Sequence, residues 1–384
     1  MPMENHDAQR REIIRNTKRV VIKVGSAVLT SEQGVDLRVI SRLADQIACL
    51  HDKGLAVVLV SSGAVASGKA RLIEQRLDVN GFPEYQALSA LGQSRLMREY
   101  DDAFRRFGKL TAQILLTRDD FKHRSRFLNA LNTMRQLLDW SVIPIVNEND
   151  TVCFQHLHFG DNDYLASLMV SLVNADLFIN LTSARGVCDV NPLQDPNAKV
   201  LPVIEDIASL DIDNLCKGKT SAGSGGMHSK LMAARRAAQI GAATIIMAGR
   251  EPHALERVFN GEALGTFIPA ESKSVSQRKF WMAYHDTPEG ALSLDAGAVR
   301  AVAERGKSLL PAGVNRVEGT FEVGALVRLL GPDGDTIGVG LTNYDSEDLA
   351  KILGRQTRDI ESLLGACPYA EIVHRDNLLL DPAI

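Results

Sequence analysis

The chain of 384 residues is longer than an ordinary single domain, so we expect two domains. Its 45% hydrophobic and 23% charged residues are typical of a soluble globular protein, and the net charge of −4 provides no global attraction to nucleic acid or to an anionic membrane. No apolar run approaches the length of a membrane span and the polar N-terminus lacks a signal-peptide core, so we expect a cytoplasmic protein without a membrane partner.

The first predicted elements follow a polar N-terminal extension, residues 1–17. Val20–Val24 is a β-branched run that ends at a glycine, which predicts a buried strand. Lys23 lies inside that strand, where its ammonium is costly to bury unless it meets an anion. Asp36–Lys53 has the apolar spacing of an amphipathic helix, and Ala56–Val60 is the second predicted strand.

Helices and strands continue to alternate along the chain. The remaining predicted elements are helix Leu88–Phe107, strand Thr111–Leu116, helix Asn129–Trp140, strand Val142–Val146, helix Tyr164–Val173, strand Leu177–Leu181, helix Leu231–Ile240 and a final strand Thr244–Ala248. This order predicts an α/β sheet that is mainly parallel and covered on both faces. Nearly every polar cluster directly follows a strand, which is the ligand-binding edge of such sheets.

The segment Asn147–Asp163 is unusually rich in acids and amides. Its charged and amide residues are Glu148, Asp150, Asp161, Asp163, Asn147, Asn149 and Asn162. They need positive partners, such as a metal ion, lysines or the ammonium of a substrate; the alternative is a solvated loop before a helix capped near Asp163. His156, His158 and Cys153 lack a fourth ligand at suitable spacing, so a polar loop is favoured there over a metal site. The five cysteines are scattered without C-x-x-C spacing, which fits a reducing compartment.

The segment Gly223–Lys230 is a glycine-rich loop that enters a predicted helix. Its backbone N–H groups can approach an anion, although a flexible turn remains the alternative. It matches neither the Walker loop nor G-x-G-x-x-G, where His228 occupies the third glycine position, so a nicotinamide dehydrogenase is disfavoured.

Two lysines from distant elements, with acids between them, are suited to phosphoryl transfer, which depends mainly on positioning and charge neutralisation. Lys23 and Lys230 could hold the γ-phosphoryl oxygens, while Asp161 or Asp163 orients them and helps to place Mg²⁺. No general base is evident, which suits a carboxylate acceptor, because that group is already ionised at neutral pH. A hydroxyl acceptor would need a base.

The pattern changes around residues 265–277. Val323–Leu330 and Thr336–Leu341 flank a turn rich in Gly, Pro and Asp, which predicts a β-hairpin, and Asp345–Leu353 predicts one small helix. We therefore expect a separate, mainly β domain from residue 276 to the end. It has 11 Lys and Arg against 16 Asp and Glu, the opposite of what an RNA backbone attracts, so packing or regulation is favoured over RNA binding.

Eight ordered motifs resemble the glutamate 5-kinases of the amino acid kinase family. They are V-I-K-V-G-S-A-V-L-T (21–30), V-S-S-G-A-V-A-S-G (60–68), A-L-G-Q-S-R-L-M (90–97), L-L-T-R-D-D-F (115–121), R-F-L-N-A (126–130), P-I-V-N-E-N-D (144–150), G-D-N-D (160–163) and G-S-G-G-M-H-S-K (223–230). S-L-L-P-A-G-V (308–314), V-E-G (317–319) and V-H-R-D (373–376) resemble the PUA domain that many of these enzymes carry.

The resemblance implies a three-layer α/β sandwich with a mainly parallel sheet, the amino acid kinase fold, over residues 18–270. A small β-barrel-like PUA domain over residues 276–384 would follow. It implies ATP- and Mg²⁺-dependent phosphorylation of the γ-carboxylate of L-glutamate, the first step of proline biosynthesis. It also implies a homo-oligomer, feedback inhibition by proline, and glutamate-5-semialdehyde dehydrogenase as the next enzyme.

The resemblance also implies roles for individual residues. Ser62, Asp150 and Asn162 match the glutamate-binding positions, and the catalytic positions match Lys23, Lys230, Asp161 and Asp163. The ATP-binding positions match Lys23, Thr182, Ser183, Ser224, Gly225, Gly226, Met227, His228, Ser229 and Lys230. No protein metal ligand is assigned.

Several residues on the expected nucleoside side depart from the family pattern. Ser183 stands where the family has aspartate, Cys188 and Asn191 alter the G-L-Y-T-A-D-P motif, and Ser224 stands where threonine is common. These changes predict an altered nucleoside affinity. Two alternatives stay open: a kinase of the same superfamily acting on aspartate, acetylglutamate or carbamate, and a catalytically weakened regulatory or RNA-binding protein.

Overall fold

The computed structural model describes residues 2–31, 34–74, 82–122, 124–152, 162–191, 195, 197–216, 226–271, 288–365 and 369–380. The chain forms two compact units. One consists of Met1–Asp120 with Ser125–Val275, and the other of Ser276–Ile384 with Phe121–Arg124. The domain limits expected from the resemblance stay predictions.

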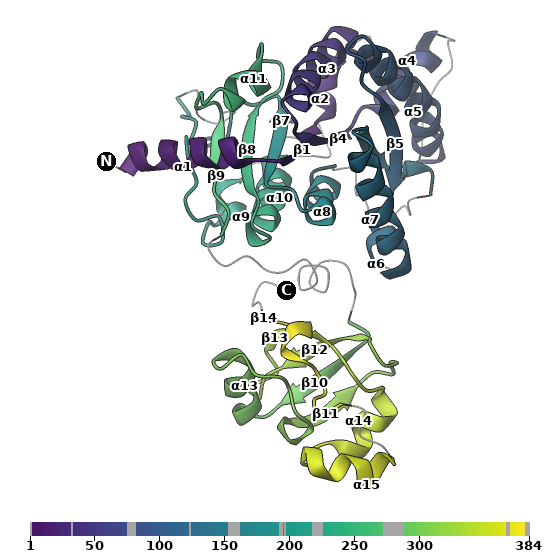
Figure 1. The fold of residues 1–384 in the computed structure, drawn as a ribbon, viewed down its shortest axis with the longest axis vertical. Helices are drawn as coiled ribbons and strands as arrows, with labels where there is room; N and C mark the ends of the chain where they lie inside the picture. Colours follow the sequence, from purple (N-terminus) through teal and green to yellow (C-terminus); the bar gives the residue numbers. More distant parts are fainter. Residues whose placement is uncertain are drawn as a thin grey trace. The chain divides into compact units, whose positions relative to one another are not determined.

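The first unit is built on a seven-stranded sheet within the described residues, in the order β5-β6-β4-β1-β7-β8-β9 (Figure 1). Its strands are β1 Arg19–Val24, β4 Ala56–Ser61, β5 Thr111–Leu116, β6 Ile143–Glu148, β7 Leu177–Thr182, β8 Ala243–Ala248 and β9 Thr266–Ile268. All neighbours pair in parallel except β8 and β9, which are antiparallel. The mainly parallel sheet is confirmed. The prediction that Thr244–Ala248 is the last strand is wrong, because three-residue β9 is too short to show a period.

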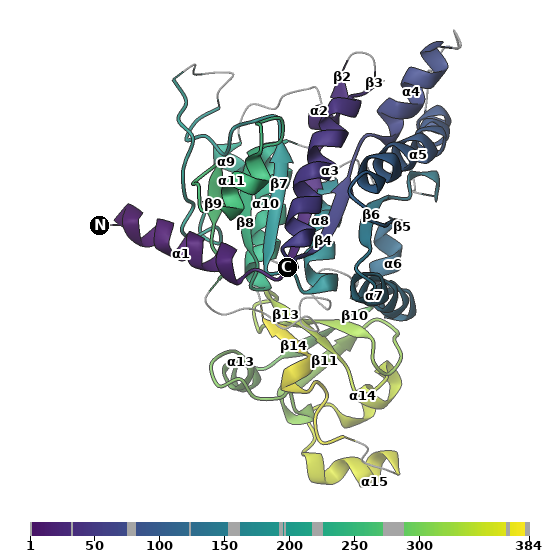
Figure 2. The same ribbon diagram turned by 45° about the horizontal axis from the view of Figure 1, so that its top comes forward.

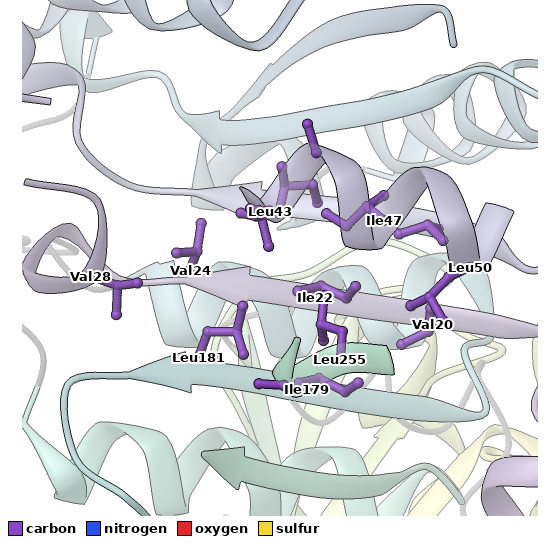
Figure 3. Close-up of a cluster of buried hydrophobic side chains, with 14 of the residues drawn as sticks. Val20, Ile22, Val24, Val28, Leu43, Ile47, Leu50, Ile179, Leu181 and Leu255 are labelled. Atoms are coloured by element: carbon purple, nitrogen blue, oxygen red, sulfur yellow. The ribbon is translucent and has the colours of Figure 1, made fainter. Parts of the chain in front are cut away.

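Helices cover both faces of this sheet. On one face, Leu43, Ile47 and Leu50 of α3 (Leu37–Asp52) pack with β1 and β7, and Leu255 of α11 (Ala254–Phe259) joins them (Figure 3). On the other face, α8 (Asn162–Val173) contacts β1, β4, β6 and β7, and α10 (Met227–Gln239) contacts β7 and β8. Side chains alternate along a strand, so even-numbered residues of β1 face α3 and Lys23 faces α8. The result is the expected three-layer α/β arrangement.

The remaining elements of this unit lie around the sheet. They are α1 Pro2–Asn16, α2 Ser26–Leu29, β2 Thr30–Ser31, β3 Gly34–Val35, α4 Ala64–Glu74, α5 Phe82–Arg105, α6 Arg118–Lys122, α7 Arg124–Asp139, the 3-10 turn η1 Asp150–Val152, and α9 Ile212–Leu215. The N-terminal extension is thus largely helical. The helices α5, α7 and α10 begin four to six residues before their predicted starts, because the apolar period of a helix does not define its first turn.

Two glycines allow α4 and α5 to pack closely (Figure 2). A Cβ at Gly68 would lie 2.0 Å from the Leu88 carbonyl oxygen, and one at Gly92 would lie 1.8 Å from the Ala64 carbonyl oxygen. Both distances are far below van der Waals contact, so only glycine fits. This approach brings α5 beside the segment that follows β6, where α5 contacts η1.

The second unit contains a five-stranded sheet of the described residues, in the order β11-β10-β12-β13-β14. Its elements are β10 Gly290–Leu294, α13 Ala296–Ala303, η2 Pro311–Gly313, β11 Val314–Glu318, β12 Leu326–Leu330, β13 Thr336–Leu341, α14 Ser346–Ile352, η3 Thr357–Asp359, α15 Ile360–Leu364, η4 Arg375–Asn377 and β14 Leu378–Leu380. The predicted hairpin is confirmed, because β12 and β13 pair antiparallel. The predicted small helix is confirmed as α14, which Asp345 caps by accepting a hydrogen bond from the Asp348 N–H.

Among the described residues, we find no helix with the length and apolar character that spanning a membrane requires.

Candidate active site

The candidate site lies at the point in the sheet where the order of the strands reverses, next to β1. From β1 the chain moves to β4, then to the edge strand β5 and back to β6 between β4 and β5, whereas β7 and β8 are added on the other side of β1. Loops that leave β1 and its two neighbours therefore diverge, and a crevice at the carboxyl ends of these strands is the usual ligand site of an open α/β sheet. The predicted polar clusters lie at this edge, because β1, β4, β6, β7 and β8 are parallel.

Asp163 joins the two predicted lysines. Its Oδ1 lies 2.6 Å from the Lys23 ammonium and its Oδ2 lies 2.9 Å from the Lys230 ammonium. Lys23 belongs to β1, Asp163 to the first turn of α8, and Lys230 to the second turn of α10. The carboxylate is fully buried and the two lysine residues are 3% and 5% exposed. The anion that buried Lys23 requires is therefore Asp163.

Two uncharged donors also contact Asp163. Asn180 Nδ2 donates to Oδ1 over 2.7 Å, and Ser229 Oγ, whose single proton is shared between Asp163 and the Gly226 carbonyl 2.8 Å away, lies 3.0 Å from Oδ2. Each carboxylate oxygen thus accepts from one ammonium and one neutral donor. Among the described residues of this group, two buried ammoniums stand against one carboxylate, and this net positive charge can neutralise an anionic group such as a phosphoryl. We call Lys23, Asp163, Asn180, Ser229 and Lys230 the lysine–aspartate cluster.

An amide network lies next to this cluster. Asn162 Nδ2 is 2.9 Å from Ser62 Oγ, 3.1 Å from the Ser61 carbonyl and 2.8 Å from Asn147 Oδ1. Asn147 Nδ2 in turn donates to Gln93 Oε1 of α5 over 2.8 Å. Ser62 and Asn162, predicted to bind substrate, are therefore in contact although they are 100 residues apart. Gln93 was not predicted, because a glutamine in a helical pattern gives no functional signal.

Asp150 lies in η1, within reach of α5. Ser89 of α5 donates a hydrogen bond to its Oδ2. Burial raises the pKa of Asp150 above its ordinary value, and the hydrogen bond from Ser89 opposes this rise because it favours the charged form. Ser89 and Gln93 are one helical turn apart, so a single face of α5 serves both Asp150 and the amide network.

The predicted nucleotide residues lie at the ends of β7 and α10. Thr182 is buried at the end of β7 and Ser183, which follows it, is exposed. Gly226 precedes α10 in an extended conformation, Met227 packs against the apolar cluster around that helix, and His228 Nε2 lies 3.0 Å from Asp213 Oδ1. Asp161, Ser224 and Gly225 lie outside the described residues.

Sequence comparison identifies the protein family of the chain. The profile described as the amino acid kinase family matches residues 18–248, and the PUA domain profile matches residues 290–364. The chain belongs to the amino acid kinase family. The family and the PUA domain expected from the motifs are thereby confirmed.

Relatives in this family align over nearly the whole chain. A protein named glutamate 5-kinase from Maridesulfovibrio salexigens is 56% identical over 98% of this chain and 100% of its own length. A protein of the same name from Nitratidesulfovibrio vulgaris strain DP4 is 55% identical over 98% of this chain and 99% of its own length. Another from Syntrophus aciditrophicus is 46% identical over 96% of this chain and 96% of its own length.

In this amino acid kinase, one helix turn joins the two halves of the candidate site. Asn162 and Asp163 are consecutive residues of α8, yet Asn162 contacts the end of β4 and Asp163 contacts β1 and β7. The amide network and the lysine–aspartate cluster are therefore adjacent.

Proposed function

We propose that the chain is a glutamate 5-kinase, which transfers the γ-phosphoryl group of ATP to the γ-carboxylate of L-glutamate and forms L-glutamyl 5-phosphate for proline biosynthesis. The observation that carries this proposal is the buried, net positive lysine–aspartate cluster beside the amide network of Asn162. The relatives that share the name, aligned over nearly the full length, confirm this prediction from the motifs.

In the proposed reaction, a γ-carboxylate oxygen of glutamate attacks the γ-phosphorus while the bond to the bridging oxygen of ADP breaks. Lys23 and Lys230 neutralise the phosphoryl oxygens, and Asp163 holds both ammoniums in place. The acceptor is already ionised near neutral pH, so no protein group has to remove a proton from it.

The substrate side uses Ser62, Asp150 and Asn162. The carboxylate of Asp150 is suited to the substrate ammonium, and Asn162 and Ser62 are suited to hydrogen bonds with substrate oxygens. Asn147 and Gln93 hold Asn162 from behind.

Asp163 does not fit a direct magnesium ligand, because both its oxygens already accept from two donors each. We therefore assign Mg²⁺ to the phosphates of ATP, where it neutralises charge. The loop around Ser224–Lys230, with Thr182 and Ser183, is the proposed nucleotide side, and Asp161 is proposed as a second catalytic acid.

The product is an acyl phosphate, which is reactive toward water, so an enzyme that consumes it directly is expected. We assign this role to glutamate-5-semialdehyde dehydrogenase in the cytoplasm. Feedback inhibition by proline, a homo-oligomer and the domain limits of residues 18–270 and 276–384 belong to the same proposal.

The pKa of Asp150 predicts how glutamate affinity depends on pH. Only ionised Asp150 attracts the substrate ammonium, so the KM for glutamate should rise as pH falls through this raised pKa. In Ser89→Ala the carboxylate loses a donor that favours its charged form, so this rise should begin at a higher pH, with kcat unchanged. The measurement is the KM for glutamate between about pH 5 and pH 8, well above the ordinary carboxyl pKa of about 4.

The control for this series is Asp150→Asn, which should show a high KM with no extra rise at low pH beyond that of glutamate itself. A Ser89→Ala curve that overlays the wild-type curve would contradict the assignment.

Ser183 predicts a change in nucleotide binding. In Ser183→Asp the family residue returns at an exposed position after β7, and the KM for ATP should change by several-fold while the KM for glutamate stays the same. Initial rates at saturating glutamate measure this. An unchanged ATP affinity counts against a role of Ser183 at the nucleoside.

The proposed function is tested by trapping the acyl phosphate with hydroxylamine in the presence of Mg-ATP and L-glutamate. Turnover with glutamate and none with aspartate, acetylglutamate or carbamate is the expected result. Equal turnover with another of these acceptors would assign a different substrate, and no turnover with any nucleotide would favour a catalytically weakened regulatory protein.

A further inference from the structure

Asn180 is a polar residue between apolar residues of the strand β7. All six residues of β7 are buried, and Asn180 is 0% exposed. It is the register partner of Lys23 on neighbouring β1, and both side chains reach the same oxygen of Asp163. Asn180 therefore enters the lysine–aspartate cluster from the sheet.

The carbonyl oxygen of the Asn180 side chain lies in a different environment from its Nδ2. Within the described part of the chain, Asn180 Oδ1 is fully buried and has no hydrogen-bond partner. A buried carbonyl oxygen without a partner destabilises the folded protein, and a leucine of similar size would avoid that penalty. The folded protein thus keeps a destabilising carbonyl oxygen, Asn180 Oδ1, on the same amide as the Nδ2 donor that contacts Asp163.

The hydrogen bond from Asn180 Nδ2 restricts the rotation of the Asp163 carboxylate, which the two lysines alone do not restrict. The terminal torsion of an aspartate is broad, and lysine side chains are long and flexible, so two ammoniums alone leave the carboxylate plane free to rotate. Asn180 and Ser229 have short side chains on a central strand and a helix. Each contacts one oxygen of Asp163, beside the lysine ammonium that reaches the same oxygen.

We propose that Asn180 is a positioning residue for phosphoryl transfer: it fixes the carboxylate of Asp163 so that Lys23 and Lys230 are divided between its two oxygens. Because the amide is neutral, it does this without reducing the net positive charge that faces the phosphoryl group. This inference rests on the proposed function and extends it to a residue of β7 that the motifs did not mark.

The experiment compares Asn180→Leu, Asn180→Asp and the matched control Thr244→Val in the full-length protein. Thr244 is fully buried on the next strand and lies outside the cluster, and its Oγ1 also lacks a partner among the residues that the structure describes. For each variant we would measure kcat, both KM values and Tm.

In Asn180→Leu, kcat should fall about tenfold while both KM values stay within about threefold, since supporting groups of a site typically contribute factors of this size. Its Tm should change little, because the removal of the unpaired oxygen offsets the loss of the Nδ2 hydrogen bond to Asp163. In Asn180→Asp, the added carboxylate cancels the net positive charge, so the KM for ATP should rise at neutral pH. Thr244→Val should leave kcat unchanged.

Two results would overturn the proposal: a wild-type kcat in Asn180→Leu, or a fall in kcat matched by a loss of thermal stability, which a merely structural role predicts. If the wild-type protein forms no glutamyl phosphate, the proposed function fails. Calorimetric binding of a non-hydrolysable ATP analogue then tests Asn180 separately. Weaker binding to both Asn180 variants than to Thr244→Val supports the positioning role, and equal binding to all three variants overturns it.

Discussion

Asp163→Asn is expected to reduce both the activity and the stability of this protein. The substitution leaves two buried ammoniums without their carboxylate and turns an amide donor toward one of them. Removing one partner of a buried ion pair typically costs about 3–5 kcal/mol. We expect kcat for glutamyl phosphate formation to fall by about 10³, because neither lysine is then held where charge develops. Hydroxylamine trapping and urea unfolding measure the two effects.

The matched control is Asp101→Asn, which removes the carboxylate of an exposed i, i+4 pair with Arg105. Exposed pairs contribute about 0–1 kcal/mol, so stability and kcat should hardly change. Asp163→Asn with wild-type stability would show that the lysines do not depend on this carboxylate.

Lys230→Met is expected to abolish most turnover while it preserves the fold. One positive group is lost from the phosphoryl position, and the loss of a single stabilising donor typically reduces kcat by about 10²–10³. Asp163 keeps Lys23, Asn180 and Ser229, so the loss of stability should be smaller than in Asp163→Asn. The KM for glutamate should not change, because the amide network is untouched. Initial rates over both substrates measure this.

Lys53→Met, at the exposed end of α3, is the control for the loss of a lysine and should behave as wild type. A Lys230→Met variant that retains more than about a tenth of wild-type kcat would remove Lys230 from the proposed catalytic set.

Local patterns accounted for the central strands and for the charged residues of the site. Val20–Val24 is recognisable because a β-branched run ends at a glycine, and Lys23 is recognisable because a charge in such a run demands a partner. Asp163 and Lys230 stand near the starts of predicted helices, where polar residues are conspicuous. The same patterns failed for β9, which is too short, and for the first turns of α5, α7 and α10, which the apolar period does not define.

The sequence by itself determined the alternation of strands and helices, and hence a parallel sheet whose carboxyl ends share one edge. Only the tertiary structure decided which polar residues meet there. Gln93 and Ser89 reach the site because Gly68 and Gly92 allow two helices to pack closely, and Asn180 reaches Asp163 because β7 lies in register with β1. Sequence periodicity reports which face of an element is buried. It carries no information about the partner on that face, which depends on strand order and on the close approach of elements far apart in the chain.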